Sequence, residues 1–500
     1  MESVNAVVKP RTVADVVALV RHARSTGQPL YPVSRSMNWG YGGMAPVQPG
    51  CTIVDLSAMD AIRNASEISA ACPVAVIEPG VTQAQLHAFL RANVPTLGFN
   101  VTGSASSSSL LGNALDRGVG YSGPRYEDVF GLEVVLGTGE VLRTGFRRLG
   151  EASPLVASHP HGLGPIADGL FFQGNFGIVT SACFRLLRKR PIERALLIGL
   201  NDAARLGEFL GRLIDLKRDG LLTSVAHVGN AARVRATLRA SLADYLQRRC
   251  EIDGPALERN IDGALALVAG TPWTALAGLS GNLGQTRAVL AEVRGRFSGL
   301  ARVRSYDGNW LVRCAWVADR LRALPAMRRV AAALAAVGPL QQLALGTPTD
   351  IAFDNLLRLY DPAGLTAPEY ERSRCGVLFV SPALPMDGPF VQRFVAELER
   401  VAQRHGHELF ITLNVETEHS LVGIVNLLFD KADAEQHRRA LACAEAMYAL
   451  VHASGLEVYR ARTDQMAAVV GRDPMHWALL RQLKDAWDPD GVIAPGRYSA

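Results

Sequence analysis

Two glycine-rich stretches carry the clearest chemical signal in this sequence. The first reads Arg35-Ser-Met-Asn-Trp-Gly-Tyr-Gly-Gly43, and the second reads Leu110-Leu-Gly-Asn-Ala-Leu-Asp-Arg-Gly-Val-Gly-Tyr121. Each follows an apolar run that predicts a strand, at 29–33 and at 94–101. Glycines in such turns let backbone N–H groups approach a ligand closely, and successive N–H groups form a concave site for anions. Two such stretches, separated by strand-like and helical segments, predict one large phosphate-bearing cofactor held from two sides.

Several other classes of protein are disfavoured. Neither stretch has the GxxxxGK[ST] or GxGxxG pattern of nucleotide triphosphatases and Rossmann dehydrogenases. The seven cysteines are scattered and never form Cys-x-x-Cys, so we expect free thiols in a reducing compartment rather than a metal site or a disulfide framework. The net charge of +5 is spread along the chain, which argues against a nucleic-acid partner. We find no signal peptide and no membrane-spanning segment, and we therefore expect a cytoplasmic protein.

The two stretches resemble the flavin-binding loops of the vanillyl-alcohol oxidase and p-cresol methylhydroxylase group of FAD enzymes. Three further segments extend the resemblance in the same order along the chain: Gly164–Phe171, Gln173–Thr180 and Asp488–Gly496. The resemblance implies an α+β fold. In this fold a two-subdomain FAD-binding domain, residues 1–190 and 456–500, carries an inserted α+β cap domain, residues 191–455, that covers the substrate.

FAD binding is assigned by this resemblance to the two glycine-rich stretches, to segment 173–179 and to the end of the chain. The expected cofactor-binding residues are Arg35, Ser36, Asn38, Gly40, Gly42, Gly43, Leu111, Gly112, Asn113, Gly118, Gly120, Tyr121, Gly174, Asn175, Gly177, Ile178, Val179 and Arg497. We expect the neighbours Asp116 and Arg117 to pair with each other or to cap a turn.

We expect the attachment of FAD to differ from the covalent attachment found in one branch of the family. In the vanillyl-alcohol oxidase branch, a cap histidine just before an apolar-serine-proline strand bonds covalently to the flavin. Here the matching segment is Arg374–Pro382, which places Val377 at the histidine position. Valine cannot form this bond, so we expect FAD to be held non-covalently.

A phenol-binding site is also implied by the resemblance. Tyr41 matches the tyrosine of the family's asparagine-aromatic-glycine-tyrosine-glycine loop, and Tyr459 and Arg460 match its tyrosine-arginine pair after the cap. In the family these three residues surround the phenol oxygen of the substrate. Two phenolic donors and one guanidinium stabilise an oxyanion and lower the pKa of the substrate phenol. Hydride loss from the benzylic carbon to flavin N5 then yields a neutral quinone methide instead of a benzylic cation.

Two more residues are candidates for catalysis. His419 stands where family members have a histidine pair, with Ser420 in place of the second histidine, and could contact substrate or transfer a proton. Phenol oxidases of the family place a carboxylate near flavin N5. Glu127 or Asp128 could supply this carboxylate here, and we assign it to Asp128. This segment, 124–133, also resembles the equivalent segment of 2-hydroxy-acid dehydrogenases in the wider superfamily.

The expected function is therefore FAD-dependent oxidation of a para-substituted phenol, a small aromatic molecule. Two alternatives stay open. One is an FAD-dependent 2-hydroxy-acid dehydrogenase in which Arg460 binds the substrate carboxylate, and the other is a catalytically silent flavin-fold binding protein. The electron acceptor, either oxygen or a redox protein, and a homo-oligomeric state are not decided by the sequence.

The elements that position these residues can be read from hydrophobic periodicity. Thr12 is expected to cap a helix that buries Val13, Val16, Val17 and Val20 on one face. Alternating or apolar runs predict strands, and longer amphipathic runs predict helices in the cap. The predicted strands are 51–56, 75–77, 132–136, 140–143, 178–187, 376–380, 407–414 and 421–429, and the predicted cap helices include 202–216, 285–297, 389–405 and 433–452.

Overall fold

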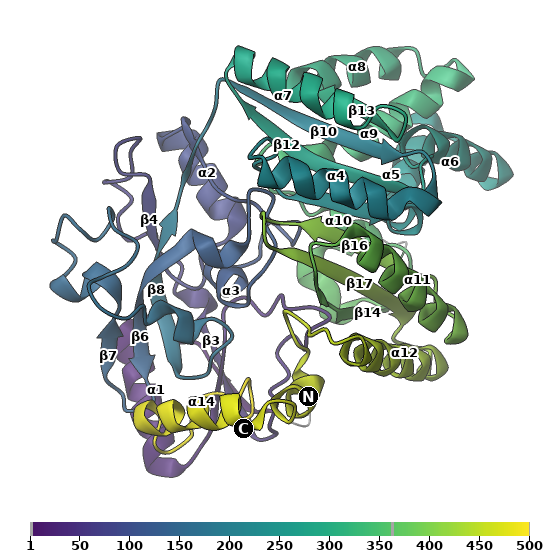
Figure 1. Ribbon diagram of the computed structural model, residues 1–500. Helices are drawn as coiled ribbons and strands as arrows, with labels where there is room; N and C mark the ends of the chain where they lie inside the picture. The colour runs from purple at the N-terminus through teal and green to yellow at the C-terminus, as the bar shows by residue number, and fades with distance from the viewer. Residues whose placement is uncertain (1–3, 362–364, 500) are drawn as a thin grey trace.

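The computed structural model describes residues 4–361 and 365–499, which fold into two lobes. The smaller lobe holds the first part of the chain and helix α14 near the C-terminus, and the larger lobe holds the middle of the chain (Figure 1).

A three-stranded parallel sheet begins the smaller lobe, in the order β1 (Val4–Val8), β3 (Cys51–Asp55) and β2 (Leu30–Val33). Helix α1 (Val13–Thr26) starts at the predicted cap, where Thr12 and Asp15 form a reciprocal capping box, and it ends at Gly27 in a left-handed conformation. Val16 and Val20 are buried against the sheet, as the periodicity predicted.

The second sheet of the smaller lobe is antiparallel. Its order is β4 (Val74–Ile77), β8 (Gly177–Arg185), β6 (Val129–Leu136) and β7 (Val141–Arg143). Helices α2 (Gln83–Asn93) and α3 (Leu110–Leu115) contribute to its core. The strand predicted at 94–101 is reduced to β5 (Leu97–Gly98), which pairs with β9 (Leu187–Arg188), because the following residues turn away to line a cavity.

An antiparallel eight-stranded sheet forms the centre of the larger lobe. Its strands are β10 (Ile192–Leu200), β11 (Ala226–Asn230), β12 (Trp273–Gly281), β13 (Ala301–Tyr306), β14 (Cys375–Val380), β15 (Ala383–Leu384), β16 (Phe410–Val415) and β17 (Leu421–Asp430). The path runs β13-β10-β12-β11-β16-β17-β14, and β15 pairs with β17.

Two groups of helices flank this sheet. One face packs against α4 (Leu206–Arg218), α7 (Leu283–Arg296), α11 (Gly388–Arg404) and α12 (Ala434–Ala453) in the largest apolar core. These four helices are the ones that the sequence predicted, within a few residues at each end. The opposite face looks toward α5 (Ala231–Cys250), α6 (Gly254–Val268), α8 (Gly308–Arg320), α9 (Pro325–Ala344) and α10 (Ile351–Leu357).

The end of the chain ties the two lobes together. Val458, Ala461 and Met466 belong to the core of the larger lobe, and α13 (Met466–Val470) follows. Helix α14 (Pro474–Trp487) then packs Leu480, Leu483 and Trp487 against the smaller lobe. We therefore propose the domain bounds 1–190, 191–455 and 456–500, with the last segment crossing from one lobe to the other.

Two chain-wide features complete the fold. All seven cysteines are unpaired, and four of them, Cys51, Cys183, Cys375 and Cys443, are buried. Among residues 4–361 and 365–499, none of the helices combines the length and the apolar character that a membrane span requires.

Candidate active site

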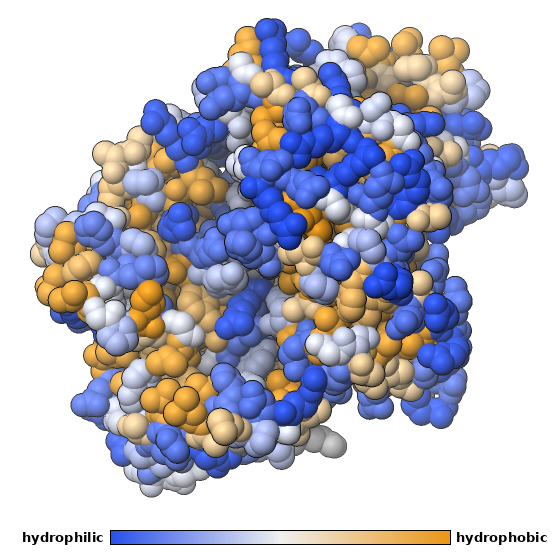
Figure 2. All heavy atoms as spheres, viewed as in Figure 1, coloured by the Kyte–Doolittle hydropathy of each residue, from blue (hydrophilic) through white to orange (hydrophobic). Residues whose placement is uncertain are grey.

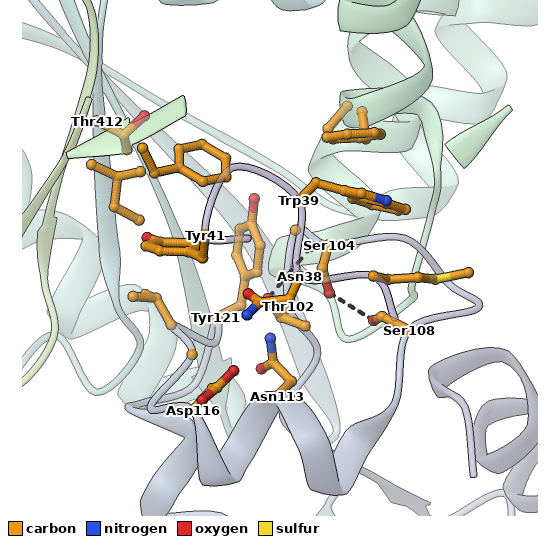
Figure 3. A pocket seen from close by; sticks show the side chains of 18 of the residues that line it. Asn38, Trp39, Tyr41, Thr102, Ser104, Ser108, Asn113, Asp116, Tyr121 and Thr412 are labelled. Carbon is orange, nitrogen blue, oxygen red and sulfur yellow. Dashed lines mark hydrogen bonds between the residues drawn. The ribbon is translucent and has the colours of Figure 1, made fainter. Parts of the chain in front are cut away.

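A cavity of about 760 Å³ is lined by residues of both lobes and of the C-terminal segment. In Figure 3, Asn113 and Asp116 project from α3 toward Asn38 and Tyr41, and Thr412 of β16 lies on the other side. The predicted site residues that line the cavity are Arg35, Ser36, Asn38, Tyr41, Gly43, Leu111, Gly112, Asn113, Gly118, Tyr121, Gly174, Asn175, Gly177, Ile178, Val179, Tyr459, Arg460 and Arg497. Gly40, Gly42, Gly120, Asp128 and His419 do not line it.

The first glycine-rich stretch is suited to hold a diphosphate. Ser36 adopts a left-handed conformation (φ 59°), and the backbone N–H groups of Ser36, Met37 and Asn38 find no acceptor within the described residues. Arg35 adds a positive charge beside them. Free N–H groups in a curved loop next to a guanidinium form an anion site.

Asn113, from α3, offers a further contact for a bound molecule. Its Oδ1 atom is buried and has no hydrogen-bond donor in the part of the chain that the structure describes. A buried polar atom without a partner is costly unless a ligand or water satisfies it. The residues present therefore fit FAD, whose phosphates and ribityl hydroxyls supply the missing acceptors and donors.

Three of the predicted glycines lie against side chains of the protein itself. A β-carbon on Gly40 would meet the Phe379 ring at 2.4 Å, one on Gly42 would meet Thr463 Oγ1 at 2.3 Å, and one on Gly120 would meet Asn100 Oδ1 at 2.2 Å. A side chain at these three positions would thus clash with other side chains of the protein. The lining of the cavity does not include these three residues, and the cofactor contact expected of them stays a prediction.

The side chain of Asn175 is also occupied by the protein. Its Nδ2 donates to Ala494 O (3.1 Å) and to Ser499 Oγ (2.9 Å), and the residue is 2% exposed. Asn175 thereby holds the C-terminal segment beside the cavity, with help from Lys484, which donates to Ile493 O at 2.7 Å. This anchoring positions Arg497 at the cavity wall.

Tyr41, Tyr459 and Arg460 come together although the first is more than four hundred residues from the others. The Arg460 guanidinium lies 4.2 Å from the centre of the Tyr41 ring, and the Tyr41 hydroxyl is 2.6 Å from Ser381 Oγ. Burial raises the pKa of the Tyr459 phenol well above its ordinary value, and the nearby Tyr41 adds to this effect. The Tyr459 phenol is therefore a neutral donor at physiological pH, and the Tyr41 ring lies beside a fixed cation.

Asp116 is the only carboxylate among the described residues that line the cavity. Its two oxygens accept from Arg460 (2.8 Å) and from Arg497 (2.5 Å), while Arg460 also donates to Asn38 Oδ1. Burial opposes ionisation, but Arg497 and Arg460 hold the pKa of Asp116 below its usual range. The expected pairing with Arg117 is wrong, because Arg117 is exposed and has a left-handed conformation (φ 54°) that turns it away.

The structure places Asp128 behind the cavity wall. It ends a short 3-10 helix (Arg125–Asp128), accepts from Asn100 Nδ2 at 3.0 Å and lies 3.4 Å from Arg125 Nε. Burial raises its pKa to about 7. Direct contact between Asp128 and a substrate or flavin is not supported, since Asn100 lies between it and Gly120.

His419 is also absent from the site. It is exposed in the turn between β16 and β17, and its backbone N–H donates to Thr417 Oγ1 at 3.1 Å. The structure does not support the catalytic role expected for His419, because the turn between β16 and β17 lies outside the lining of the cavity.

Beside the predicted residue Tyr121, the cavity is lined on the cap side by three polar residues that sequence reasoning missed: His227, Arg233 and Asn414. The centroids of the His227 and Tyr121 rings lie 4.1 Å apart with an interplanar angle of 35°, and burial lowers the pKa of His227 to about 4. His227 Nε2 and both amide atoms of Asn414 have no hydrogen-bond partner within the described residues. Arg233 donates to Thr237 Oγ1 but has no carboxylate partner there. The only sequence signal of His227 and Asn414 was polarity in otherwise apolar strands, and Arg233, on helix α5, had none.

Residues 4–145 match the family model described as FAD binding domain. The chain is 31% identical over 503 residues, 99% of its length and 90% of the relative's, to 1'-carboxy-chondrochloren decarboxylase of Chondromyces crocatus. It is 26% identical, over 99% and 87% of the two lengths, to the flavoprotein subunit of 4-cresol dehydrogenase (hydroxylating) of Pseudomonas putida.

Solved structures show the same fold. A 4-ethylphenol oxidase of Gulosibacter chungangensis superposes with a TM-score of 0.80 at 23% identity, covering 99% of this chain and 88% of that one. A p-cresol methylhydroxylase superposes with a TM-score of 0.76 at 23% identity, covering 98% and 88%. The predicted fold class, a two-part FAD-binding domain with an inserted α+β cap, and the predicted cofactor, FAD, are confirmed. The protein is therefore an FAD-dependent oxidoreductase that belongs to the vanillyl-alcohol oxidase and p-cresol methylhydroxylase family.

Proposed function

We propose that this enzyme oxidises a para-substituted phenol at its benzylic carbon. The observation that carries the proposal is the convergence of Tyr41, Tyr459 and Arg460 on one point of the cavity wall. The two phenol groups donate hydrogen bonds to the substrate oxygen, and the guanidinium favours its ionised form.

The charges around Arg460 support phenolate binding. Asp116 offers one negative charge to two guanidinium groups, those of Arg460 and Arg497, so the trio keeps a net positive charge. In a buried site this excess attracts one anion, and a phenolate supplies it. FAD, when bound, supplies the two-electron acceptor that takes a hydride from the benzylic carbon. The role of the chain's own residues is to hold the phenolate, whose electrons turn the ring into a quinone methide as the hydride leaves.

The 2-hydroxy-acid alternative gains less support from the same contacts. Arg460 would have to present its planar fork to a substrate carboxylate, but it already donates to Asp116 and to Asn38. A hydroxy acid also leaves the hydroxyl groups of Tyr41 and Tyr459 without a phenolate to bind.

Flavin reduction under anaerobic conditions tests the proposal. Tyr459→Phe is expected to slow reduction by 4-ethylphenol by ~10–100-fold, the effect of one charge-assisted hydrogen bond. Tyr126→Phe, at an exposed tyrosine outside the cavity, is the matched control. The methyl ether of the same phenol is expected not to reduce the flavin, because it cannot ionise. Equal rates with the phenol and its ether would contradict the phenolate mechanism.

A second outcome of the same chemistry is loss of carbon dioxide. A relative named as a carboxy-chondrochloren decarboxylase and the unpaired Arg233 at the cavity favour it. If the substrate carries a carboxylate on the carbon next to the benzylic carbon, the bond to that carboxylate can break in the quinone methide. The electron pair of the broken bond forms a carbon–carbon double bond while the ring returns to a phenolate.

Arg233 is the residue that we propose to bind this carboxylate. A 3-(4-hydroxyphenyl)propanoate tests the reaction: we expect 4-vinylphenol and carbon dioxide in equal amounts. Arg233→Leu is expected to lower the affinity for this acid by ~10–100-fold while leaving 4-ethylphenol unaffected. A hydroxylated acid that retains its carboxylate would rule out decarboxylation and leave phenol oxidation intact.

We further propose that FAD is bound without a covalent link to residue 377. Val377 lies in β14, is 3% exposed and packs in an apolar cluster, and it does not line the cavity. Acid precipitation of the yellow protein is expected to leave the flavin in the supernatant. A yellow pellet with a colourless supernatant would show that the flavin is bound covalently to another residue.

A further inference from the structure

The cavity extends far into the cap, beyond the residues proposed to hold the phenol. Apolar side chains line this extension, which we call the apolar arm and define by Leu197 of β10, Leu276 of β12, Leu238 of α5, Val268 of α6, and Ala333 and Val337 of α9. None of these residues takes part in the chemistry proposed above.

One row of paired residues crosses the sheet and gives the arm its direction. Arg304 pairs with Leu197, Leu197 with Leu276, Leu276 with His227, and His227 with Asn414. Directly paired residues of neighbouring strands point to the same face, and all five line the cavity. Because adjacent strands lie about 4.8 Å apart, the part of the row from His227 to Arg304 spans about 14 Å. The row is polar at the end near Tyr121, apolar in the middle and charged at the far end.

Helix α9 contacts β10 and β12, but Leu197 and Leu276 in the middle of this row line the cavity. Along β10, Leu196 and Ile198 point into the large core, whereas Leu197 between them points to the cavity. The helices α5, α6 and α9 form a core of their own, which includes Leu238 and Ala333 but no strand residue. An apolar sheet face and an apolar helix layer thus face each other across the cavity. Soluble proteins rarely leave such surfaces unpaired unless a ligand binds between them.

The far end of the arm reaches the protein surface. Leu267 and Trp310, which line it, are 47% and 48% exposed, and Arg304 is exposed as well. Figure 2 shows hydrophobic residues gathered at the top right of the molecule, over α8, where Val312 and Trp316 are also exposed. This opening lets a long substituent enter or project from the cap.

We propose that the apolar arm binds an extended apolar chain carried by the para substituent of the substrate. This inference rests on the proposed oxidation of a phenol, and it narrows the substrate to an amphiphilic phenol whose tail lies between β10, β12 and α9. A short alkylphenol fills the reactive end and leaves the arm without a ligand.

Equilibrium binding tests the arm separately from catalysis. The flavin of the holoenzyme is first reduced with dithionite, so that no phenol can be oxidised, and binding of 4-ethylphenol and 4-octylphenol is measured by anaerobic calorimetry. Six additional methylene groups are expected to tighten binding by at least about 100-fold. Ala333→Phe, which fills the arm, is expected to weaken the binding of 4-octylphenol by at least about 30-fold. The same variant is expected to change the affinity for 4-ethylphenol by less than about 3-fold.

Matched variants make the result specific. Ala335 lies on the same helix but is exposed, so Ala335→Phe is expected to leave both affinities unchanged within about 3-fold. Leu276→Trp fills the arm from the facing strand and replaces Ala333→Phe if that variant does not fold. The inference is overturned if 4-octylphenol binds no more tightly than 4-ethylphenol, or if its advantage survives in the filled variants.

Failure of the proposed function has a different signature. If neither phenol reduces the oxidised flavin but the binding pattern holds, phenol oxidation is wrong and the arm remains a site for an apolar chain. If 4-ethylphenol reduces the flavin and 4-octylphenol shows no binding advantage, the arm inference is wrong and phenol oxidation stands.

Discussion

At the reactive end of the cavity, Arg460 and Arg497 both donate to Asp116. At the cap end, His227, Asn414 and Arg233 face the cavity without ionic or complete hydrogen-bond partners among the described residues. The reactive end is therefore organised before any substrate binds, which lowers the reorganisation required during the reaction. The cap end has polar groups that only a ligand or water can satisfy. We therefore propose that the first region determines the chemistry and that the second selects the substituent on the phenol.

The two ends also differ in charge. Among the described residues that line the cavity there are five arginines, Arg35, Arg233, Arg304, Arg460 and Arg497, and one aspartate. Asp116 compensates charge only at the reactive end, and we propose that the diphosphate of FAD compensates the charge of Arg35. The uncompensated positive charge near the cap favours a substrate with an acidic group there, in keeping with the role proposed for Arg233.

The largest expected effect tests whether the reactive end determines the chemistry. Arg460→Leu removes the guanidinium that stabilises the phenolate, and we expect flavin reduction by 4-ethylphenol to slow by about 10²–10³-fold, as for loss of one preorganised donor. Arg304→Leu, at the exposed end of the arm, is the control and is expected to change this rate by less than about 3-fold. Rates are measured by anaerobic stopped-flow absorbance. Similar losses in the two variants would remove the distinction between the ends.

A second prediction concerns the packing that supports the reactive end. Gly120→Ala would push the Asn100 side chain, which accepts from Ser122 N (2.8 Å) and donates to Asp128 (3.0 Å). We expect the free energy of unfolding to fall by about 2–4 kcal/mol, from overpacking and lost hydrogen bonds. Thermal unfolding measures this loss, with Gly169→Ala as the control because its β-carbon would meet open space. If Gly120→Ala loses its flavin but keeps the stability of the wild type, the result would instead support a direct contact between Gly120 and the cofactor.

The smallest expected effect lies on the cap side, at Glu416. Burial raises the pKa of this carboxyl to about 7, a change opposed by a hydrogen bond from Ser420 and by the charge of Lys217 and increased by Glu127. Because the folded pKa exceeds the unfolded value of about 4.5, the folded protein binds the proton more tightly. Its stability should therefore fall as pH rises from about 4.5 to 7, and remain lower above that range.

Glu416→Gln removes this titration. We expect the variant to be more stable than the wild type by ~1–2 kcal/mol at pH 8 and equally stable at pH 4. Unfolding in denaturant at the two pH values measures the difference. A constant difference at both values would show that Glu416 acts through packing and not through its charge.

Local sequence patterns determined several features of this protein directly. The capping box of α1 and the alternation of its valines involve neighbouring residues, so they are independent of the rest of the fold. The glycine-rich stretches marked the cofactor site, and the resemblance that they carry brought Tyr41, Tyr459 and Arg460 to one cavity. Strands β10 and β12 are harder to predict, because apolar residues on both faces form runs that also suit a buried helix.

Only the tertiary structure decided how charges and glycines are used. The partners of Asp116 lie 344 and 381 residues away, so its neighbour Arg117 was a misleading guide. Likewise, a glycine pattern reports that a side chain is excluded, but not whether a cofactor or another side chain, such as Asn100 beside Gly120, excludes it. The apolar arm depends on which residues of β10 and β12 line the cavity beside α5, α6 and α9, and that is set by the packing of distant segments. Sequence periodicity shows that a residue is apolar; only the assembled layers show whether it faces a core or a cavity.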